Sequence, residues 1–375
     1  MWLLLVAVGL LPTWASAREC NATLSTIHTQ ADIDALAQNC TSLSRGLTIS
    51  SEYSGPVLLP NIVNISSWYI RQDSRDPLRI TAFEMPDLEE ANEIQLMPLT
   101  DIESWSVPKL TTARGVSLEI PSYLEELDFP KLNSTSDLRV GGNLTNVSFD
   151  SLRAVDGEVK IYNTDSPLMP AETRMNLSFP ALESAFGLRV WGNISSLALP
   201  QLTKLGIDKP GYNPLPSLFS NSGPPLPLDL PNLSSVEERL HIKGNFSSLS
   251  LPAFKNITDS LEITATSPLA IDLPLEDATG VFLVGQIESV SLPNLRNWTT
   301  LYVRSDLPFD CEGFIDRFNG TTSGPAPGEV RCEVTGEDRD QEDEDEGNLA
   351  TRRIADLGGV FAAAITGIVI GHVVI

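Results

Sequence analysis

The hydrophobic and polar residues of this chain follow a pattern that recurs about every 20 to 22 residues. Its marker is an apolar residue, a proline, one variable residue and a second apolar residue, as in residues 107–110 and 129–132. Such a period predicts a repeat architecture, because one unit of this size cannot bury its own apolar face. Five whole copies align without gaps and keep their apolar residues in the same columns: 118–132, 138–152, 188–202, 240–254 and 281–295.

Within a copy, apolar and polar residues alternate, as in Leu240, His241 and Ile242. A period of two predicts short strands with one buried face. Gly244 is expected to turn the corner to a second strand, which Pro252 ends. Stacking the copies gives an all-β fold, a leucine-rich parallel β-solenoid of roughly 11 to 12 coils at about 4.8 Å per coil. The alternative is a leucine-rich α/β globular protein.

A short helix is predicted ahead of the first coil. Thr29 and Asp32 have the spacing of a capping box, and the apolar residues Ile33, Leu36 and Ala37 follow at helical intervals. This helix would cap the open edge of the first coil.

Two intervals between markers are longer, at 30 and 31 residues. The second contains an insertion rich in proline, residues 208–227. Insertions in a solenoid emerge as loops, so this segment is expected to be a loop, either passive or on a binding face.

The two ends of the chain are interpreted as targeting signals. Residues 1–17 are an apolar run that ends in Ala15, Ser16 and Ala17, which predicts a secretory signal peptide cleaved after Ala17. Residues 357–375 contain no Asp, Glu, Lys or Arg. They are interpreted as the tail of a removable GPI-attachment signal, with a membrane span as the alternative.

The predicted attachment residue is Asn348, with Gly347 as the second choice. The body is therefore assigned to residues 18–333, an acidic stalk to residues 334–348 and the removed GPI signal to residues 349–375. Residues 337–346 carry eight acids and one base and are expected to be a solvated spacer. They lack the glycine and the spacing of an EF-hand calcium loop.

The four cysteines lie as two local pairs, Cys20 with Cys40 and Cys311 with Cys332. Behind a signal peptide, an even number of cysteines indicates disulfides. Three connectivities are possible. The local one is favoured, because each bridge then closes a loop of about 20 residues, worth roughly 3 kcal/mol in the loop-entropy model.

Asn-x-Ser/Thr sequons occur throughout the body and predict a heavily glycosylated extracellular protein. They are Asn21, Asn39, Asn64, Asn133, Asn143, Asn146, Asn176, Asn193, Asn232, Asn245, Asn256, Asn297 and Asn319.

Charge and composition narrow the function further. The formal net charge of −24 argues against nucleic acid as a partner, because phosphate binding needs a basic face. Three histidines and widely separated cysteines offer too few ligands for a metal site, so neither a metal nor a cofactor is predicted.

No catalytic residue is predicted. Asp101 and Glu103 could share a face, as the carboxylates of polysaccharide-cleaving β-helices do, but a solvated face is the favoured interpretation. His241 is expected to face outward, without a nucleophile motif beside it. Trp105 falls in an inward column. Exposure of Trp191 on a glycan-stacking surface is the alternative to a structural role, which is favoured.

The order of these features resembles a known family. Residues 29–37, Cys40 and residues 46–49 are similar to the N-terminal cap and first coil of fungal GPI-anchored cell-wall organisation glycoproteins. The repeats of that family resemble receptor L domains. The closing pair Cys311 and Cys332 also resembles that family, and the resemblance covers about residues 20–333. It implies a right-handed β-solenoid, a location at the plasma membrane or the cell wall, and a role in wall integrity.

One departure is the acidic stalk, where that family has a long Ser/Thr-rich one. It favours retention at the extracellular face of the membrane over covalent transfer into the wall. The expected function is therefore a non-enzymatic surface glycoprotein that binds or scaffolds wall glucan, mannoprotein or wall enzymes. The alternatives are a carbohydrate-active β-helix enzyme and a receptor-like ligand-binding ectodomain.

Overall fold

The computed structural model of the chain describes residues 19–20, 25–44, 46–163, 173–206, 216–318 and 328–335, without the side chains of residues 19, 25, 66–68 and 122–123. The predicted signal peptide, Asn21, Asn319, the acidic segment, Asn348 and the GPI signal lie outside these residues.

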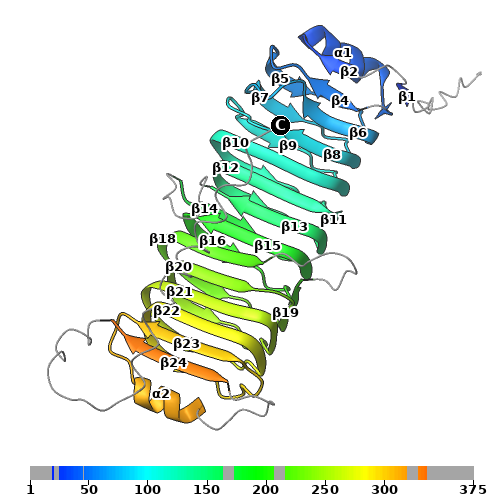
Figure 1. Cartoon of the computed structure of the whole chain (residues 1–375). Coiled ribbons are helices and arrows are strands. Elements are labelled where there is room, and N and C mark those ends of the chain that lie inside the picture. The colour runs from blue at the N-terminus through cyan, green and yellow to red at the C-terminus, as the bar shows by residue number, and fades with distance from the viewer. Residues whose placement is uncertain are drawn as a thin grey trace, which may run out of the picture. The chain divides into compact units, whose positions relative to one another are not determined.

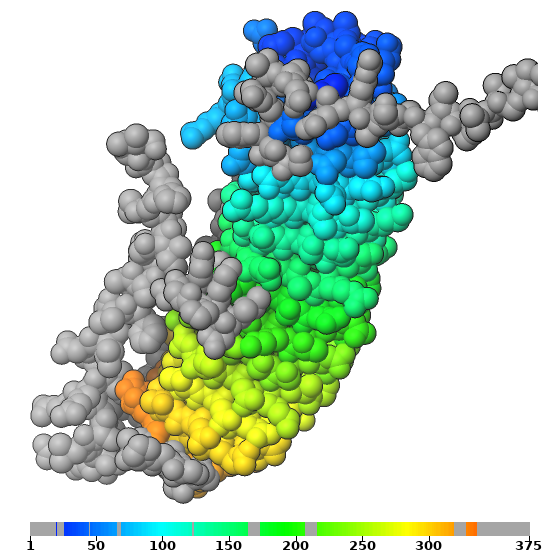
Figure 2. All heavy atoms as spheres, turned by 90° about the vertical axis from the view of Figure 1, so that its right-hand side faces the viewer, coloured from blue at the N-terminus to red at the C-terminus, as the bar shows by residue number. Residues whose placement is uncertain are grey.

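The body is a parallel β-solenoid of about 12 turns, as the repeat predicts. Its strands lie side by side in Figure 1, and Figure 2 shows the coils as successive bands in chain order. A 21-stranded sheet contains β1 (Glu19–Cys20), β2 (Ser25–Ile27), β3 (Ser42–Leu43), β4 (Leu47–Ile49), β6 (Asn64–Gln72), β8 (Glu90–Leu96), β10 (Thr112–Asp128), β11 (Ser134–Thr135), β12 (Asp137–Ser148), β13 (Ala154–Tyr162), β14 (Met175–Ser178), β15 (Ser184–Gly192), β16 (Ile194–Ala198), β17 (Lys204–Leu205), β18 (Ser217–Asp229), β19 (Ser235–Val236), β20 (Leu240–Ser250), β21 (Asn256–Asp272), β22 (Asp277–Ser291), β23 (Thr300–Ser305) and β24 (Glu329–Val334). A three-stranded sheet contains β5 (Ser54–Leu58), β7 (Arg79–Glu84) and β9 (Ser104–Ser106).

The apolar columns of the repeat form the core. Leu240 and Ile242 are fully buried, and they are the ladder partners of Leu261 and Ile263 in the next coil. The same columns continue through most coils, so each coil covers the apolar face of its neighbour. Burial of these side chains supplies the main driving force for stacking, at about 25 cal/mol per Å² of apolar surface.

A row of aromatic rings runs through the N-terminal half of the core. The rings of Phe83 and Trp105 stack at a centroid distance of 4.6 Å, and Trp105 lies 5.7 Å from Phe129. Phe149 stacks on Phe129 at 5.2 Å and on Phe179 at 5.0 Å. Trp105 is buried, which confirms its inward column. The repeat explains this row, because it brings equivalent residues into contact once per coil.

Glycine and asparagine alternate in the column at the corner between the two strands of a coil. Gly142, Gly192 and Gly244 have positive φ values of 124°, 133° and 114°. The backbone register places Asn163 and Asn221 between these glycines in the same column. A Cβ on Gly244 would lie 2.0 Å from the backbone oxygen of Asn221, so the corner excludes larger residues there.

The side chains of the two corner asparagines hold neighbouring coils together. Asn221 Oδ1 accepts hydrogen bonds from the backbone N–H groups of Ile194 and Gly223. Its Nδ2 donates to the carbonyl oxygens of Pro224 and Asn245. The side chain therefore satisfies backbone groups where a glycine corner breaks the regular ladder. The sequence pattern did not predict this role.

Both ends of the described body carry a helix and a disulfide. α1 (Gln30–Asn39) begins where predicted, and the Asp32 carboxylate accepts a hydrogen bond of 2.8 Å from the Thr29 N–H. α2 (Cys311–Phe318) lies at the other end. Cys20 is bonded to Cys40 and Cys311 to Cys332, so the local connectivity is confirmed. Among the described residues no helix is both long and apolar enough to cross a membrane.

Two sequence predictions about boundaries need correction. Residues 217–227 of the predicted loop belong to β18, which pairs with β20 as an ordinary coil. Only residues 207–215 of the longer interval lie outside the described residues. The strand tolerates its prolines because the ladder with β20 shifts register twice, before and after Leu226. At the C-terminal end β24 runs to Val334, one residue past the predicted boundary.

Candidate binding face

The outward side of the long sheet forms a continuous surface along the body (Figure 1). The parallel register places an outward-facing residue of each first strand beside its equivalent in the next coil. This column runs through Arg71, Gln95, Ser117, Arg139, Lys160, Arg189, Leu218, His241, Glu262, Phe282, Tyr302 and Arg331. A second outward column runs through Glu119, Gly141, Tyr162, Trp191, Ser220, Lys243, Thr264, Val284 and Arg304. We call these two columns together the sequon-free face.

None of the sequon asparagines that the structure describes lies on this face. Asn143, Asn193 and Asn245 directly follow corner glycines. Asn146 and Asn176 lie on the second strands of their coils. None of these attachment points therefore lies in either column of the sequon-free face. The other described sequons lie at the end of α1, in turns, or where the chain enters the long sheet: Asn39, Asn64, Asn133, Asn232, Asn256 and Asn297.

Three cations occupy consecutive coils of the sequon-free face. Arg139 on β12 is the ladder partner of Lys160 on β13, which is the ladder partner of Arg189 on β15. We call these three residues the cation row. Arg139 is exposed, and the other two side chains are half-buried. Neighbouring strands lie about 4.8 Å apart, so the fold holds like charges side by side.

On other surfaces of the solenoid, ion pairs join oppositely charged residues of neighbouring coils. Arg153 lies 3.6 Å from Glu183, and Lys255 lies 3.2 Å from Glu276. Exposed pairs of this kind stabilise by about 0–1 kcal/mol, and like charges directly opposite each other on neighbouring strands are destabilising. Three like charges in one column are therefore less favourable for folding than charges of alternating sign would be.

Two stacked aromatic rings lie beside the cation row. Tyr162 and Trp191 stack at a centroid distance of 4.6 Å with an angle of 3° between their planes. The Tyr162 ring lies over Gly141, where a Cβ would come within 2.2 Å of it. The Lys160 ammonium lies 5.2 Å from the centroid of the Trp191 ring. The rings thus form a rigid floor for the long cationic side chains.

Hydrogen bonds hold this floor in place. The Tyr162 hydroxyl donates to Glu119 Oε2 at 2.5 Å and accepts from Arg139 Nη2 at 3.1 Å. Burial, and then the hydrogen bond to Glu119, raise the pKa of Tyr162 to about 12, so the hydroxyl keeps its proton at physiological pH. Arg189 pairs with Glu158 at 3.3 Å.

Lys160 is the central residue of the cation row. Burial, and then the charge of Arg139, lower the pKa of its ammonium group below the usual value. Among the described residues, no carboxylate oxygen lies within 4.0 Å of this ammonium. Arg139 and Arg189 have polar partners for their guanidinium groups, whereas the Lys160 ammonium lies against aromatic rings.

The structure excludes the alternative in which Trp191 is exposed. The residue does lie on the outward side, as the alternation requires, but its exposed fraction is 4%. The parallel ring of Tyr162 covers one side of the indole, and Lys160 and Arg189 lie over it. Its surface is therefore not open for stacking on a glycan.

His241 faces outward, as predicted, but is partly buried between the coils of Leu218 and Glu262. Burial, and then the charges of Lys243 and Arg239, lower the pKa of His241 to about 4. The imidazole is therefore neutral at physiological pH.

This shift predicts a pH dependence of stability. Between pH 6.5 and about 4 the unfolded chain binds a proton at His241 that the folded chain does not, so stability falls as the pH falls through this range. The expected loss is on the order of 3 kcal/mol, and His241→Gln should remove it. Urea unfolding of both proteins at pH 7 and pH 4 measures the difference. Equal losses in the two proteins would contradict the assignment.

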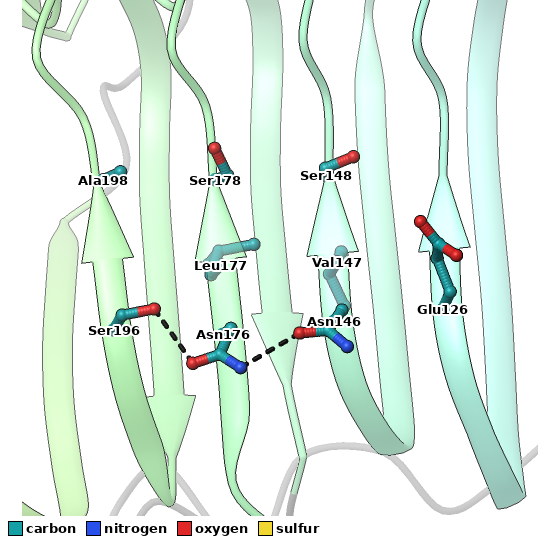
Figure 3. Close-up of a pocket in the computed structure, with 9 residues that line it drawn as sticks. All are labelled: Glu126, Asn146, Val147, Ser148, Asn176, Leu177, Ser178, Ser196 and Ala198. Atoms are coloured by element: carbon teal, nitrogen blue, oxygen red, sulfur yellow. Dashed lines mark hydrogen bonds between the residues drawn. The ribbon is translucent and has the colours of Figure 1, made fainter.

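A shallow cavity of about 310 Å³ lies on a different surface, over β12, β14 and β16 (Figure 3). Asn176 donates to Asn146 Oδ1 at 3.0 Å and accepts from the Ser196 hydroxyl at 3.0 Å. Figure 3 shows Asn146, Asn176 and Ser196 as a ladder across neighbouring strands. Because Asn146 and Asn176 are sequon residues, a sugar on either would fill this hollow. This hollow therefore lies at two of the sequons that the sequence predicts to carry glycans.

The other predicted candidates do not assemble into a site. Asp101 and Glu103 are both exposed, on either side of the buried Ile102, and no contact joins their carboxylates. Within the described part of the chain no three His, Cys, Asp or Glu side chains lie close enough together to hold a metal ion. Sequence reasoning missed the cation row, although Arg139 and Arg189 occupy the same column of two aligned copies.

Comparison with protein-family models, with curated proteins and with solved structures gave no match to this chain.

Proposed function

We propose that this chain is a non-enzymatic, GPI-anchored cell-surface glycoprotein of a fungal wall, which binds or scaffolds wall glycans or wall enzymes. The observation that carries the proposal is the arrangement of the sequons. The described sequons lie on other strand positions, in turns and at the corners of the coils, and leave the two columns of the sequon-free face without an attachment point. A bare face on a heavily glycosylated rod is a surface kept open for a partner.

The rest of the described body supports this role. Both ends carry a local disulfide, which suits an oxidising extracellular compartment. The stacked coils form a rigid scaffold, because each coil is packed against its neighbours throughout. The sequon-free face suits binding of a partner better than catalysis. Its charged residues lie in rows along an open surface and not around an enclosed pocket.

A glycan placed on the sequon-free face tests the proposal. Glu262→Asn creates a sequon there with Thr264, and the added glycan is expected to abolish the contribution to wall integrity by covering the face. Lys109→Asn creates a matched sequon with Thr111 on the surface of the turns, and Glu262→Gln removes the same charge without a sequon. Both should behave as wild type. Each variant replaces the native gene, and growth is measured in the presence of a wall-stressing dye.

Delivery to the surface is the control for this experiment. Phosphatidylinositol-specific phospholipase C is expected to release wild type and all three variants equally from intact membranes. A gel shift would establish that the new sequons carry glycans. A glycosylated Glu262→Asn protein that restores full dye resistance would contradict a role for the face, and wild type that resists the lipase would contradict the anchor.

A further inference from the structure

The cation row is unusual in a chain with a net charge of −24. Neutral or alternating residues in this column would be more favourable for folding, as the ion pairs on the other surfaces show. The carboxylates near the row are Glu119 on β10, in the coil before Arg139, Glu158 in the coil of Lys160, and Asp137 in the coil of Arg139. Glu119 accepts a hydrogen bond from Tyr162, and Glu158 pairs with Arg189.

These pairings leave the Lys160 ammonium as the group best placed to take an added anion. It lies between two guanidinium groups and against the Tyr162 and Trp191 rings. An anion placed there would relieve the repulsion between the three cations. Exposed Arg139 and partly exposed Arg189, whose side chain is 37% exposed, could then bind neighbouring anionic groups in bidentate geometry.

The spacing of the row indicates a polymer. The three cations lie on neighbouring strands, so successive charges are about 4.8 Å apart along the solenoid. A single small anion would contact one or two of them, whereas a chain with a charge on successive sugars would contact all three. The open sheet surface offers room for a long molecule. The hydroxyl groups of such a chain would also find a polar side chain in the second column, that of Thr264.

We propose that the cation row binds an acidic polysaccharide, whose carboxylate, sulfate or phosphate groups lie across the coils of β12, β13 and β15. This inference rests on the proposed function, because it names the ligand class of the sequon-free face. Tyr162 and Trp191 act as positioning residues: they hold the cationic side chains and do not stack on the sugars.

Binding of the full-length glycosylated protein to immobilised polysaccharides tests the inference. Polygalacturonate and dextran sulfate are the acidic probes, and dextran is the neutral control. We expect binding to both acidic probes that weakens as salt rises, because these contacts are partly exposed. Lys160→Met keeps the packing against the rings and should weaken binding about tenfold, as expected for the loss of a charge-assisted contact. Lys160→Glu should weaken it further.

Lys131→Glu is the matched control for Lys160→Glu. It makes the same change of charge, from positive to negative, at an exposed turn outside the sequon-free face. It should bind as wild type, and circular dichroism should show that all variants fold. Equal affinities of wild type and Lys160→Met would overturn the inference, as would equal binding to dextran. An acidic peptide with the sequence of residues 337–346 is tested in the same assay. If it binds as tightly as polygalacturonate, the ligand of the cation row is an acidic protein segment and not a polysaccharide, and the inference is overturned.

The Glu262→Asn variant separates this inference from the proposed function. If its glycan blocks polymer binding while Lys160→Met does not, the face is functional and the cation row is not its ligand site. If neither change affects polymer binding or dye resistance, both proposals fail.

Discussion

Replacing Phe149 with alanine is expected to lower the free energy of unfolding by about 3–5 kcal/mol. Phe149 is fully buried and stacks on the rings of Phe129 and Phe179. Its removal would leave a cavity between two coils that the neighbouring rings cannot fill, because the backbone ladder fixes their spacing. The loss includes two aromatic contacts beyond the buried area. Urea unfolding followed by tryptophan fluorescence measures the change.

Leu58→Ala is the control for this substitution, because Leu58 is an apolar strand residue with an exposed fraction of 39%. Its change should stay within about 0.5 kcal/mol. A loss below about 1 kcal/mol for Phe149→Ala would mean that the aromatic row does not hold the coils together. Each coil contacts only its neighbours, so the mutated region could unfold at a lower urea concentration than the rest of the body. A separate unfolding transition of this kind would show that the destabilisation is local.

Replacing Asn221 with alanine is expected to destabilise the protein by about 3 kcal/mol or more. The change removes four hydrogen bonds, to the backbone of Ile194, Gly223, Pro224 and Asn245. These groups lie at a corner where the regular ladder is interrupted, so no neighbouring strand can replace the lost partner. Each buried group left unsatisfied costs about 1–3 kcal/mol.

Hydrogen exchange gives this prediction a local readout. The amides of Ile194 and Gly223 should exchange faster in Asn221→Ala, while amides of β22 stay protected. Asn294→Ala is the matched control, since Asn294 is exposed in a turn. Unchanged exchange at Ile194 would show that the corner amide is dispensable.

The sequon-free face and the cation row depend on the same property of the fold. A solenoid repeats one position per coil, so a residue type that recurs in the sequence becomes a column in space. Arg139 and Arg189 sit in aligned copies and could have been recognised as one column. Lys160 could not, because its coil spans the longer interval of 30 residues and was not among the aligned copies.

The sequence by itself determined the fold class, the coil period, the cap helix and the inward columns. All of these follow from local rules: alternation sets which side chain faces inward, and a period of about 20 residues sets which coils stack. The local disulfides follow too, because short loops close most readily.

Only the tertiary structure decided which residues of different coils meet. The pairing of Lys160 with two arginines depends on the register between strands, which the one-coil pattern does not contain. Trp191 is buried because a ring from the previous coil stacks on it, and alternation predicts only the side of the sheet. The prolines of β18 suggested a loop, but the register shifts and the Asn221 hydrogen bonds allow a strand there. In each case contacts between coils decide the outcome, and the local sequence pattern does not. The free energy of stacking comes from many residues at once, so it outweighs the preference of a single residue.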